Sequence, residues 1–510
     1  MKKCIREYYD NGDVKSEYYY KDETKQEFHR EDGPAKIYYY SNGNINIEEY
    51  YKDGVLHRED GPAKIEYCED GNIGGEEYYK DGVLHREDGP AKIEYCEDGS
   101  KEFEVYYMNG ELHRKNGPVH VQYYENGNIE YETYFKDDIC HREDGPAITK
   151  YYENGNKEYE VYYRDGVIHR EDGPAQTFYY ETGDKKQEIY YKDGEYYRED
   201  GPFILQYFKN GNEEYEAYYK DDSYHRECGP ARIRYRKDGS KEFEEYFRNG
   251  ERHRIDGPAQ EYYYENGNKS YEVYYMNGRQ HRKNGPAHIQ YYKNGNIEYV
   301  EYFKHGLYHR EDGPARVQYY SNGNKDFEEY YKDDVLHRED EPAKILYYNN
   351  GKIEYEEYYK DEKLHRENGP AITHYYENGN KEYEVYYREG VIHREDGPAR
   401  IRYHEDGNKE FEEYFRNGER HRIDGPAREY YYENGNKIYE AYYINGRQHR
   451  KNGPAHIQYY KNGNIEYVEY FKHGLYHRED GPARIWYYRN GNADYEEYYK
   501  NGVLISGRLL

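Results

Sequence analysis

The sequence contains few of the residues that usually build a globular core. Its 510 residues include 1 Trp, 3 Met and 13 Phe, and only 35% of the chain is apolar. The mean hydropathy is −1.48. A conventional aliphatic core of this length is therefore excluded. No run of about 18 apolar residues occurs, so a transmembrane helix is excluded as well.

Cysteines are few, and a leader-like segment is missing. Five cysteines, an odd number, fit a reducing compartment better than a disulfide framework. The first residues, from Met1 to Tyr8, lack the apolar stretch of a secretory signal. Together these absences predict a cytoplasmic protein.

Tyrosine, glycine and acidic residues are abundant instead. The chain has 81 Tyr and 50 Gly, and 104 acidic residues face 75 basic ones, for a formal net charge of −29. Low hydropathy with high charge is typical of disorder, but disordered chains contain few aromatic residues and this one has 19%. The composition therefore indicates a folded chain with an unusual interior.

A 28-residue repeat runs through almost the whole sequence. The phrase His-Arg-Glu-Asp-Gly-Pro-Ala, with local variations, recurs from His29 to His477 in steps of 28 residues, which makes 17 copies, and all 17 prolines occupy one position in it. We therefore divide the chain into a partial repeat or cap (1–28, with a three-residue insertion near Lys25), one continuous repeat domain (29–504) and a C-terminal cap (505–510). Residues 233–316 are nearly repeated at 401–484, which fits duplication of whole repeats.

Each repeat has the pattern of a β-hairpin. The segments 35–40 and 45–51 are rich in β-branched and aromatic residues, and Asn42-Gly43 between them is a hairpin signal. A two-residue turn would pair Ile37 with Glu48, whereas a three-residue loop with Gly43 in the left-handed position pairs Ile37 with Ile47. We expect the three-residue loop, since Glu occupies the position of Glu48 in nearly every repeat.

A second corner follows the hairpin. The segment 52–54 predicts another turn, and 55–58 predicts a short strand. Pro62 then blocks ladder hydrogen bonds, so Asp60-Gly61-Pro62 redirects the chain. The fold expected is all-β, an elongated antiparallel hairpin meander forming one twisted sheet, with a β-solenoid as the alternative. In a meander, Cys68 and Cys96 lie about 9.6 Å apart, too far for a disulfide.

The repeat resembles MORN-type repeats, in particular the variant MORN family. The resemblance is carried by Glu49-Tyr50-Tyr51-Lys52-Asp53-Gly54-x-x-His57 and by Tyr40-Ser41-Asn42-Gly43. The His-Arg-Glu-Asp-Gly-Pro-Ala phrase stands where that family has a short glycine-rich passage. The resemblance implies a non-catalytic scaffold that binds proteins, sometimes lipids, and sometimes dimerises. The array is also similar to those of large DNA viruses of amoebae, which would place the protein in the host cytoplasm or the virion.

Chemistry at a single site is not favoured by this sequence. A catalytic site is one constellation of different groups, but here every reactive residue type recurs in each repeat. Each repeat supplies one histidine at its corner, and neighbouring copies about 9.6 Å apart are too distant to share a zinc ion. We therefore expect no enzyme activity, no cofactor and no metal site.

The partner expected is another protein. A net charge of −29 disfavours nucleic acid and anionic membranes. The predicted strand phase places Tyr50 and its equivalents opposite the apolar face, where they are either a packing layer against the His-Arg corner or an exposed ladder that binds partners. The candidate surface consists of Tyr50, Tyr78, Tyr106, Tyr134, Tyr162, Tyr190, Tyr218, Tyr246, Tyr274, Tyr302, Tyr330, Tyr358, Tyr386, Tyr414, Tyr442, Tyr470 and Tyr498. The structural motif of each repeat is represented by Asn42, Gly43, His57, Arg58, Asp60, Gly61, Pro62 and Ala63.

The function expected is a scaffold for protein–protein interaction through a tyrosine-rich, acidic β surface. The alternative is a structural protein that self-assembles, such as a component of a virion or a cell cortex. A third hypothesis is an array that binds divalent cations through the Glu-Asp-Gly carboxylates. A homodimer is a further hypothesis about the partner.

Overall fold

The computed structural model describes residues 3–24 and 26–510, and every helix or strand within them is a β-strand. The predicted insertion near Lys25 falls partly outside the described residues. The chain divides into two compact bodies, Met1–Glu251 and Arg252–Leu510. We call them the N-terminal and the C-terminal body and describe each by itself. No helix in the described part of the chain could cross a membrane.

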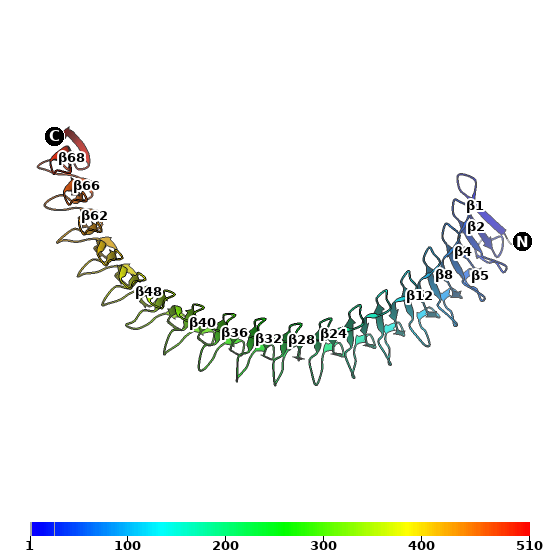
Figure 1. Cartoon of the computed structure of the whole chain (residues 1–510). Helices are drawn as coiled ribbons and strands as arrows, with labels where there is room; N and C mark the ends of the chain where they lie inside the picture. The colour runs from blue at the N-terminus through cyan, green and yellow to red at the C-terminus, as the bar shows by residue number, and fades with distance from the viewer. Residues whose placement is uncertain (1–2, 25) are drawn as a thin grey trace. The chain divides into compact units, whose positions relative to one another are not determined.

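One repeat consists of a long hairpin and a short one. Strands β3 (Lys36–Tyr39) and β4 (Ile45–Glu49) form the long hairpin, as the β-branched and aromatic residues of these segments predict (Figure 1). Strands β5 (Tyr51–Lys52) and β6 (Val55–Leu56) form the short one, which recurs as far as β65 (Phe471–Lys472) and β66 (Leu475–Tyr476).

The loop of the long hairpin has the predicted length. The Tyr40 amide donates to the Asn44 carbonyl at 2.8 Å, and the Gly43 amide donates to the Tyr40 carbonyl at 3.0 Å. Three residues, 41 to 43, therefore separate the closing pair. Gly43 has φ of 88°, the left-handed conformation that glycine adopts without strain.

The predicted register, in contrast, is wrong. Tyr39 pairs with Ile45 but Tyr38 pairs with Ile47, so that Asn46 is an extra residue in the second strand. This is a β-bulge, and it shifts all pairs beyond it by one residue. Ile37 consequently faces Glu48 instead of Ile47. The same shift occurs in the later long hairpins, for example between Glu66 and Tyr67.

The predicted turn at 52–54 is confirmed, and the strand that leads to it is interrupted at Tyr50. Asp53 and Gly54 have φ of 52° and 85°, as in a two-residue hairpin turn of type I′. The chain leaves the long hairpin at Tyr50, whose amide donates to the Ala63 carbonyl of the next repeat at 2.7 Å. The Tyr50 carbonyl accepts from the His57 amide at 3.0 Å. The segment predicted as one strand, 45–51, is therefore two strands with a bend at Tyr50.

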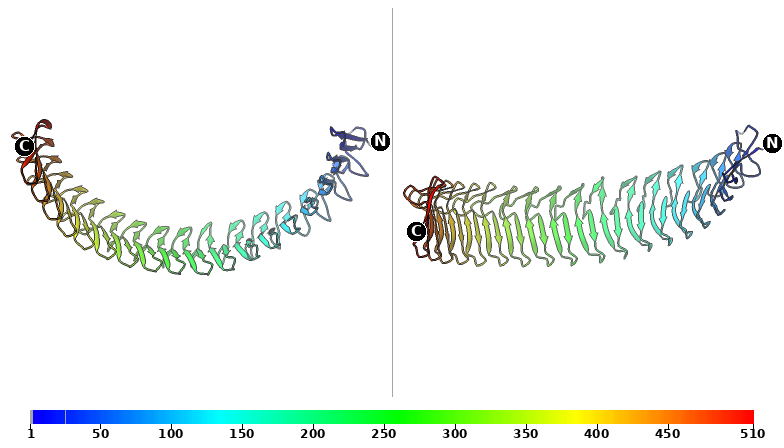
Figure 2. Two further views of the ribbon diagram at one scale, coloured as in Figure 1. Left: turned by 45° about the horizontal axis from the view of Figure 1, so that its top comes forward. Right: turned by 90° about the horizontal axis from the view of Figure 1, so that it is seen from above.

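The long strands form an antiparallel meander in each body, which confirms the expected fold over the solenoid (Figure 2). Thirty-seven strands of the described residues belong to it. In the N-terminal body they are β1 (Lys3–Tyr8), β2 (Val14–Tyr20), β3, β4, β7 (Lys64–Tyr67), β8 (Ile73–Glu77), β11 (Lys92–Tyr95), β12 (Lys101–Val105), β15 (His120–Tyr123), β16 (Ile129–Thr133), β19 (Ile148–Tyr151), β20 (Lys157–Val161), β23 (Gln176–Tyr179), β24 (Lys185–Ile189), β27 (Ile204–Tyr207), β28 (Glu213–Ala217), β31 (Arg232–Tyr235) and β32 (Lys241–Glu245).

The C-terminal body repeats this order and ends in a longer hairpin. Its strands are β35 (Gln260–Tyr263), β36 (Lys269–Val273), β39 (His288–Tyr291), β40 (Ile297–Glu301), β43 (Arg316–Tyr319), β44 (Lys325–Glu329), β47 (Lys344–Tyr347), β48 (Ile353–Glu357), β51 (Ile372–Tyr375), β52 (Lys381–Val385), β55 (Arg400–Tyr403), β56 (Lys409–Glu413), β59 (Arg428–Tyr431), β60 (Lys437–Ala441), β63 (His456–Tyr459), β64 (Ile465–Glu469), β67 (Arg484–Tyr487), β68 (Ala493–Lys500) and β69 (Val503–Leu509). In the N-terminal body, Cys68 and Cys96 follow β7 and β11, which are separated by β8, and both are free thiols.

The interior is thin, as the low hydropathy predicts. Ala35 and its equivalents at the start of the long hairpins are fully buried, and Ile37 is 8% exposed. Buried apolar residues of neighbouring hairpins pack together. In one such cluster Ile289, Val300 and Val317 are in contact, and Tyr302 packs against them. Tyr302 is equivalent to Tyr50, so these tyrosines lie on the apolar face. The predicted placement on the opposite face is wrong because the bulge at Asn46 reverses the phase of the second strand beyond it.

Candidate functional site: the row of corners

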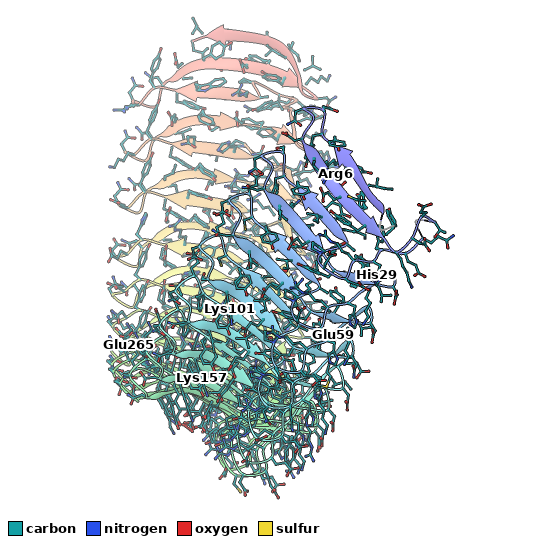
Figure 3. The ribbon with its side chains drawn as sticks, turned by 90° about the vertical axis from the view of Figure 1, so that its right-hand side faces the viewer. Arg6, His29, Glu59, Lys101, Lys157 and Glu265 are labelled. Atoms are coloured by element: carbon teal, nitrogen blue, oxygen red, sulfur yellow. The ribbon has the colours of Figure 1, made fainter. Side chains whose placement is uncertain are left out.

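Each repeat carries a corner, by which we mean the seven residues that begin at the His-Arg pair, such as His57–Ala63. Figure 3 labels His29 and Glu59, from two successive corners, on the opposite side of the N-terminal body from Lys101 and Lys157. A groove of about 650 Å³ separates these two corners, and Tyr50 lies between them in its lining. A groove of about 640 Å³ follows between the corners at His57 and His85. The corners therefore form a row of similar grooves.

An arginine stacked on a tyrosine forms the floor of each groove. The Arg58 guanidinium carbon lies 4.0 Å from the ring centroid of Tyr50, a cation–π contact. Arg58 Nη1 donates to the Pro62 carbonyl at 3.3 Å, and Nε donates to Asp60 Oδ1 at 3.1 Å. A Cβ at Gly61 would lie 3.0 Å from the guanidinium carbon, so the glycine leaves room for the arginine.

The stack explains the tyrosines singled out in the sequence. Tyr50 and most of its equivalents are half-buried, and Tyr358 is buried. Arginines cover one side of these rings in both bodies, as Arg86 covers Tyr78 and Arg450 covers Tyr442, each at 3.8 Å. The tyrosines are thus a packing layer against the His-Arg corner, and the edges of their rings line the grooves.

The corner histidine ties each corner to the next repeat. His57 Nδ1 accepts a hydrogen bond from the Asp81 amide at 3.1 Å, 24 residues further along the chain. A neutral imidazole that accepts at Nδ1 carries its proton on Nε2. The His57 side chain is only 8% exposed, and its buried Nε2 has no hydrogen-bond partner in the protein, with Glu59 Oε1 3.6 Å away. The same ring nitrogen is unpartnered at many corners, including His85, His141 and His309.

The rim of a typical corner is acidic. The Glu59 and Asp60 side chains are 80% and 87% exposed. Lys52 of the short hairpin lies 3.6 Å from Glu59, and Arg58 pairs with Asp60. The short hairpin and corner at 52–60 thus carry two cations against Asp53, Glu59 and Asp60. An excess of acid over base also occurs at 80–88, 136–144, 164–172, 192–200, 220–228, 332–340 and 388–396, but not in every repeat.

A row of buried glutamates is a feature that the sequence reasoning missed. Glu160, which is 7% exposed, accepts hydrogen bonds from Tyr179 Oη at 2.7 Å and Lys157 Nζ at 2.5 Å. Burial, and then the Glu160 carboxylate, raise the pKa of Tyr179 well above its ordinary value. Glu occupies this position, equivalent to Glu48, in nearly every repeat, which is the signal that could have identified it.

The structure brings together most of the motif residues of a repeat, but not all. Tyr50, His57, Arg58, Asp60 and Gly61 meet at the corner, where Pro62 and Ala63 lead into the next strand. Asn42 and Gly43 lie at the far end of the long hairpin, where Asn42 Nδ2 donates to the Glu69 carbonyl of the next loop at 3.1 Å. Across residues 3–24 and 26–510, no three His, Cys, Asp or Glu side chains are grouped to hold a metal ion.

Comparison with solved structures gives remote matches only. This protein is 11% identical to a chain described as "Crystal Structure of TcdB2-TccC3", with a TM-score of 0.11. The matched region covers 97% of this protein and 28% of that chain. A second match, "Crystal Structure of TcdB2-TccC3-Cdc42", has a TM-score of 0.10 with the same identity and coverage. This protein spans less than a third of those chains, and scores this low carry no argument. No curated protein matches.

The family comparison is informative. The family described as "MORN repeat variant" matches seven segments, at residues 4–22, 35–53, 119–137, 148–165, 175–193, 344–361 and 427–445. The segment 35–53 runs from the buried Ala35 through the long hairpin to the turn at Asp53, and the later segments cover equivalent parts of their repeats. The seven matches, together with the hairpin meander, support a MORN-type repeat family for this chain.

Proposed function

We propose that the protein is a non-catalytic scaffold that binds protein partners along its row of corners. Repetition supports the absence of catalysis, because each corner offers the same His, Arg, Glu and Asp and no unique constellation stands out. A MORN-type repeat array supports a binding role.

The observation that carries the proposal is the row of unpartnered histidine nitrogens. A buried N–H without a partner costs free energy, and an acceptor from a bound molecule would remove that cost. At His57, His85, His309 and His421 this nitrogen lies beside a groove of about 620 to 650 Å³ whose lining includes a tyrosine and an arginine. Tyrosine and arginine are also the residues that contribute most to protein interfaces.

The spacing of the grooves favours an extended polypeptide as the partner. Successive corners are two strands apart, which corresponds to about 9.6 Å. An extended chain covers that distance with about three residues, so that it could place one side chain or carbonyl in each groove. Binding would then spread over several corners, and no single groove would be essential.

Carboxyl labelling of the protein with and without its purified partner tests this proposal. We expect the partner, isolated in a defined stoichiometry, to protect Glu59, Glu87 and other corner carboxylates from labelling. Glu69 is exposed in the hairpin loop at the other end of the strands and serves as the internal control. Protection confined to the loops would contradict the proposal. Assembly into fibres without a partner would support the structural alternative.

A further inference from the structure

The charge of the corner row is reversed in two stretches of the C-terminal body. The typical short hairpin and corner, such as 52–60, contain two basic and three acidic residues. In three successive repeats, the segments 252–256, 276–284 and 304–312 together contain seven basic residues against Asp256, Glu311 and Asp312. The seven are Arg252, Arg254, Arg279, Arg282, Lys283, Lys304 and Arg310.

The second stretch, 420–480, lies six repeats later and has the same charges. Its basic residues are Arg420, Arg422, Arg447, Arg450, Lys451, Lys472 and Arg478, against Asp424, Glu479 and Asp480. We call the corner and short-hairpin residues of 252–312 site A and those of 420–480 site B. Each has an excess of four positive charges in a chain whose net charge is −29.

Site A contains a groove that holds a fixed guanidinium. The groove, of about 640 Å³, is lined by Arg282, Lys283 and Lys304 among others. The Arg282 guanidinium carbon is 3.8 Å from the Tyr274 ring, and Nη1 donates to the Pro286 carbonyl at 3.1 Å. At typical corners the aspartate two residues on pairs with this arginine, as Asp172 does with Arg170 at 2.9 Å. Asn284 replaces that aspartate in site A, so its carboxylate no longer neutralises the arginine.

A second acidic residue is replaced in the same grooves. The turn residue that faces the corner histidine is an aspartate in eight of the 17 repeats, for example Asp81 beside His57. In site A it is His305, whose ring stacks on His281 with centroids 4.8 Å apart, and in site B His473 stacks on His449 at the same distance. Burial, then His305 and Lys304, lower the pKa of His281. Lys283 and Lys451 also stand where a typical corner has Glu59, so each site lacks an acidic group at these three positions. The groove of site A keeps Glu311 and Asp312 beside its cationic donors.

Each site also exposes one large apolar side chain. Ile255 in site A is 77% exposed and Ile423 in site B is 80% exposed, at the position where Glu59 stands in a typical corner. Ile423 lines a groove of about 620 Å³ next to Arg422. A nucleic acid or a free phosphate would leave these isoleucines in water. A polypeptide with both acidic and apolar side chains would cover them.

We propose that sites A and B each dock one short acidic segment of a partner protein. Its carboxylates enter the groove at Arg282 and Lys283 in site A, or contact Arg450 and Lys451 in site B, and an apolar side chain covers Ile255 or Ile423. This proposal rests on the scaffold function and names the chemistry of one partner. The two sites are twelve strands, or about 58 Å, apart along the sheet, so a partner with two acidic segments would gain from binding both.

The neighbouring corners limit the length of the ligand. The next corner after site A carries Glu339 and Asp340, behind a turn with Asp333 and Asp334. Duplex DNA, with a charge about every 1.7 Å, would run onto this acidic stretch and be repelled. An acidic segment of about five to seven residues, extended at about 3.4 Å per residue, spans about 17 to 24 Å and so matches the roughly 19 Å between the first and third corners of a site.

Calorimetry with a synthetic peptide tests the proposal on the full chain. The probe is an extended peptide with alternating Glu and Leu residues, and a control peptide has Ser in place of Leu. We expect two probe peptides per chain, with weaker binding of the control. K283E should reduce the stoichiometry to one, and K283E combined with K451E should weaken binding at least tenfold and reduce its dependence on salt.

The chain offers a matched control variant. Lys115 and Asn116 form a third corner with the Lys-Asn pair, but Asp137 and Asp138 occupy the turn that faces it. K115E should leave peptide binding unchanged. All three lysines are exposed, and circular dichroism would verify that the variants keep their β structure.

The results that overturn the proposal are distinct from those that overturn the scaffold function. The proposal fails if K283E with K451E binds the peptide like the unaltered chain, or if K115E weakens binding equally. It also fails if duplex DNA, inorganic phosphate or phosphatidylserine vesicles compete more strongly than the peptide. In each case a partner footprint on the corner carboxylates would still uphold the scaffold function.

Discussion

Arg142 shows how much of a corner depends on one side chain. Its guanidinium carbon lies 3.9 Å from the Tyr134 ring, and Nη1 donates to the Pro146 carbonyl at 3.1 Å. A Cβ on Gly145 would lie 2.7 Å from that carbon, which is closer than real contacts allow. The glycine therefore leaves room for the guanidinium in this position, and the sequence alone indicated it only as part of a turn.

We predict that Gly145→Ala displaces Arg142 from Tyr134. The overpacked corner should lose about 1–3 kcal/mol of local stability. Hydrogen exchange of the Tyr134 amide, which donates to the Ala147 carbonyl at 2.7 Å, measures this loss. Adding Arg142→Ala removes the clash, so the double variant should lose less than the sum of the two single variants. Equal exchange in Gly145→Ala and the unaltered chain would contradict the prediction.

Buried tyrosines predict a limit to stability at high pH. Burial, and then Glu216, raise the pKa of Tyr218 to about 12, and Tyr218 Oη donates to Glu216 at 3.0 Å. Burial also raises the pKa of Tyr299 to about 12. An unfolded tyrosine has a pKa of about 10. Because the pKa of these tyrosines is higher in the folded state than in the unfolded state, their protonated hydroxyls stabilise the fold fully below pH of about 10. This stabilisation is lost as the pH rises towards about 12.

We therefore expect the β structure to unfold as phenolate forms between pH of about 10 and about 12. Parallel titrations by ultraviolet absorbance and circular dichroism measure the two events. The chain in denaturant should titrate at the ordinary tyrosine pKa. Tyrosines that titrate at that value in the folded chain, without loss of β structure, would contradict the prediction.

At the scale of the element, the sequence predicts the hairpin and its loop but not its register. Positions 46–48 read polar, aromatic, polar in most repeats, as in Glu158-Tyr159-Glu160, which has the pattern of a regular strand. The bulge between positions 45 and 47 adds a residue without disturbing this pattern. The bulge therefore leaves the sequence pattern nearly unchanged, but it changes the cross-strand partner of every residue beyond it. The face of Tyr50 and the burial of the glutamates followed from the register and were missed with it.

In two repeats the position of the buried glutamate is occupied by a valine. Val300 and Val468 occupy the glutamate position, and Ile297 and Ile465 stand where Lys157 is found. We predict that Glu160→Val alone destabilises the hairpin by about 1–3 kcal/mol, because Tyr179 loses a buried hydrogen-bond acceptor. Adding Lys157→Ile should restore part of the loss.

A double-mutant cycle measured by local hydrogen exchange tests this coupling. Tyr179→Phe in the Glu160→Val background is the control, since it removes the unpaired hydroxyl. Additive effects of Glu160→Val and Lys157→Ile would show that the two side chains are independent in spite of their contact.

At the scale of the whole molecule, the 28-residue period allowed the meander to be predicted. A long strand pairs only with the strands before and after it in the meander, so a hairpin pattern that recurs at a fixed spacing leaves little choice of topology. One of the two alternatives that the sequence left open for Tyr50, a packing layer against the His-Arg corner, placed tyrosine, histidine and arginine together. The sequence could not show which ring the arginine covers, because that depends on the bend at Tyr50. The reversed charges of sites A and B were readable in the sequence, but a consensus of the repeats conceals them.

Contacts limited to neighbouring repeats predict that whole repeats can be removed. Deletion of residues 57–84 joins Leu56 to His85 and recreates the junction between Leu84 and His85. We expect this variant to keep its β structure and a nearly unchanged thermal midpoint. Deletion of 57–70, half a repeat, should disrupt folding because strand order and loops no longer match. Circular dichroism and thermal melting compare the two, and similar melting of both would contradict the prediction.

The direction of the ladder hydrogen bonds has a mechanical consequence. In a meander these bonds run along the array, so tension along a body would load one pair of strands at a time and open it like a zipper. Each repeat occupies about 9.6 Å of array but contains 28 residues, which extend to about 95 Å. Under tension a body would lengthen about tenfold in equal steps and shorten again as its hairpins refold. The extended length that such an array could reach is therefore set by its number of repeats.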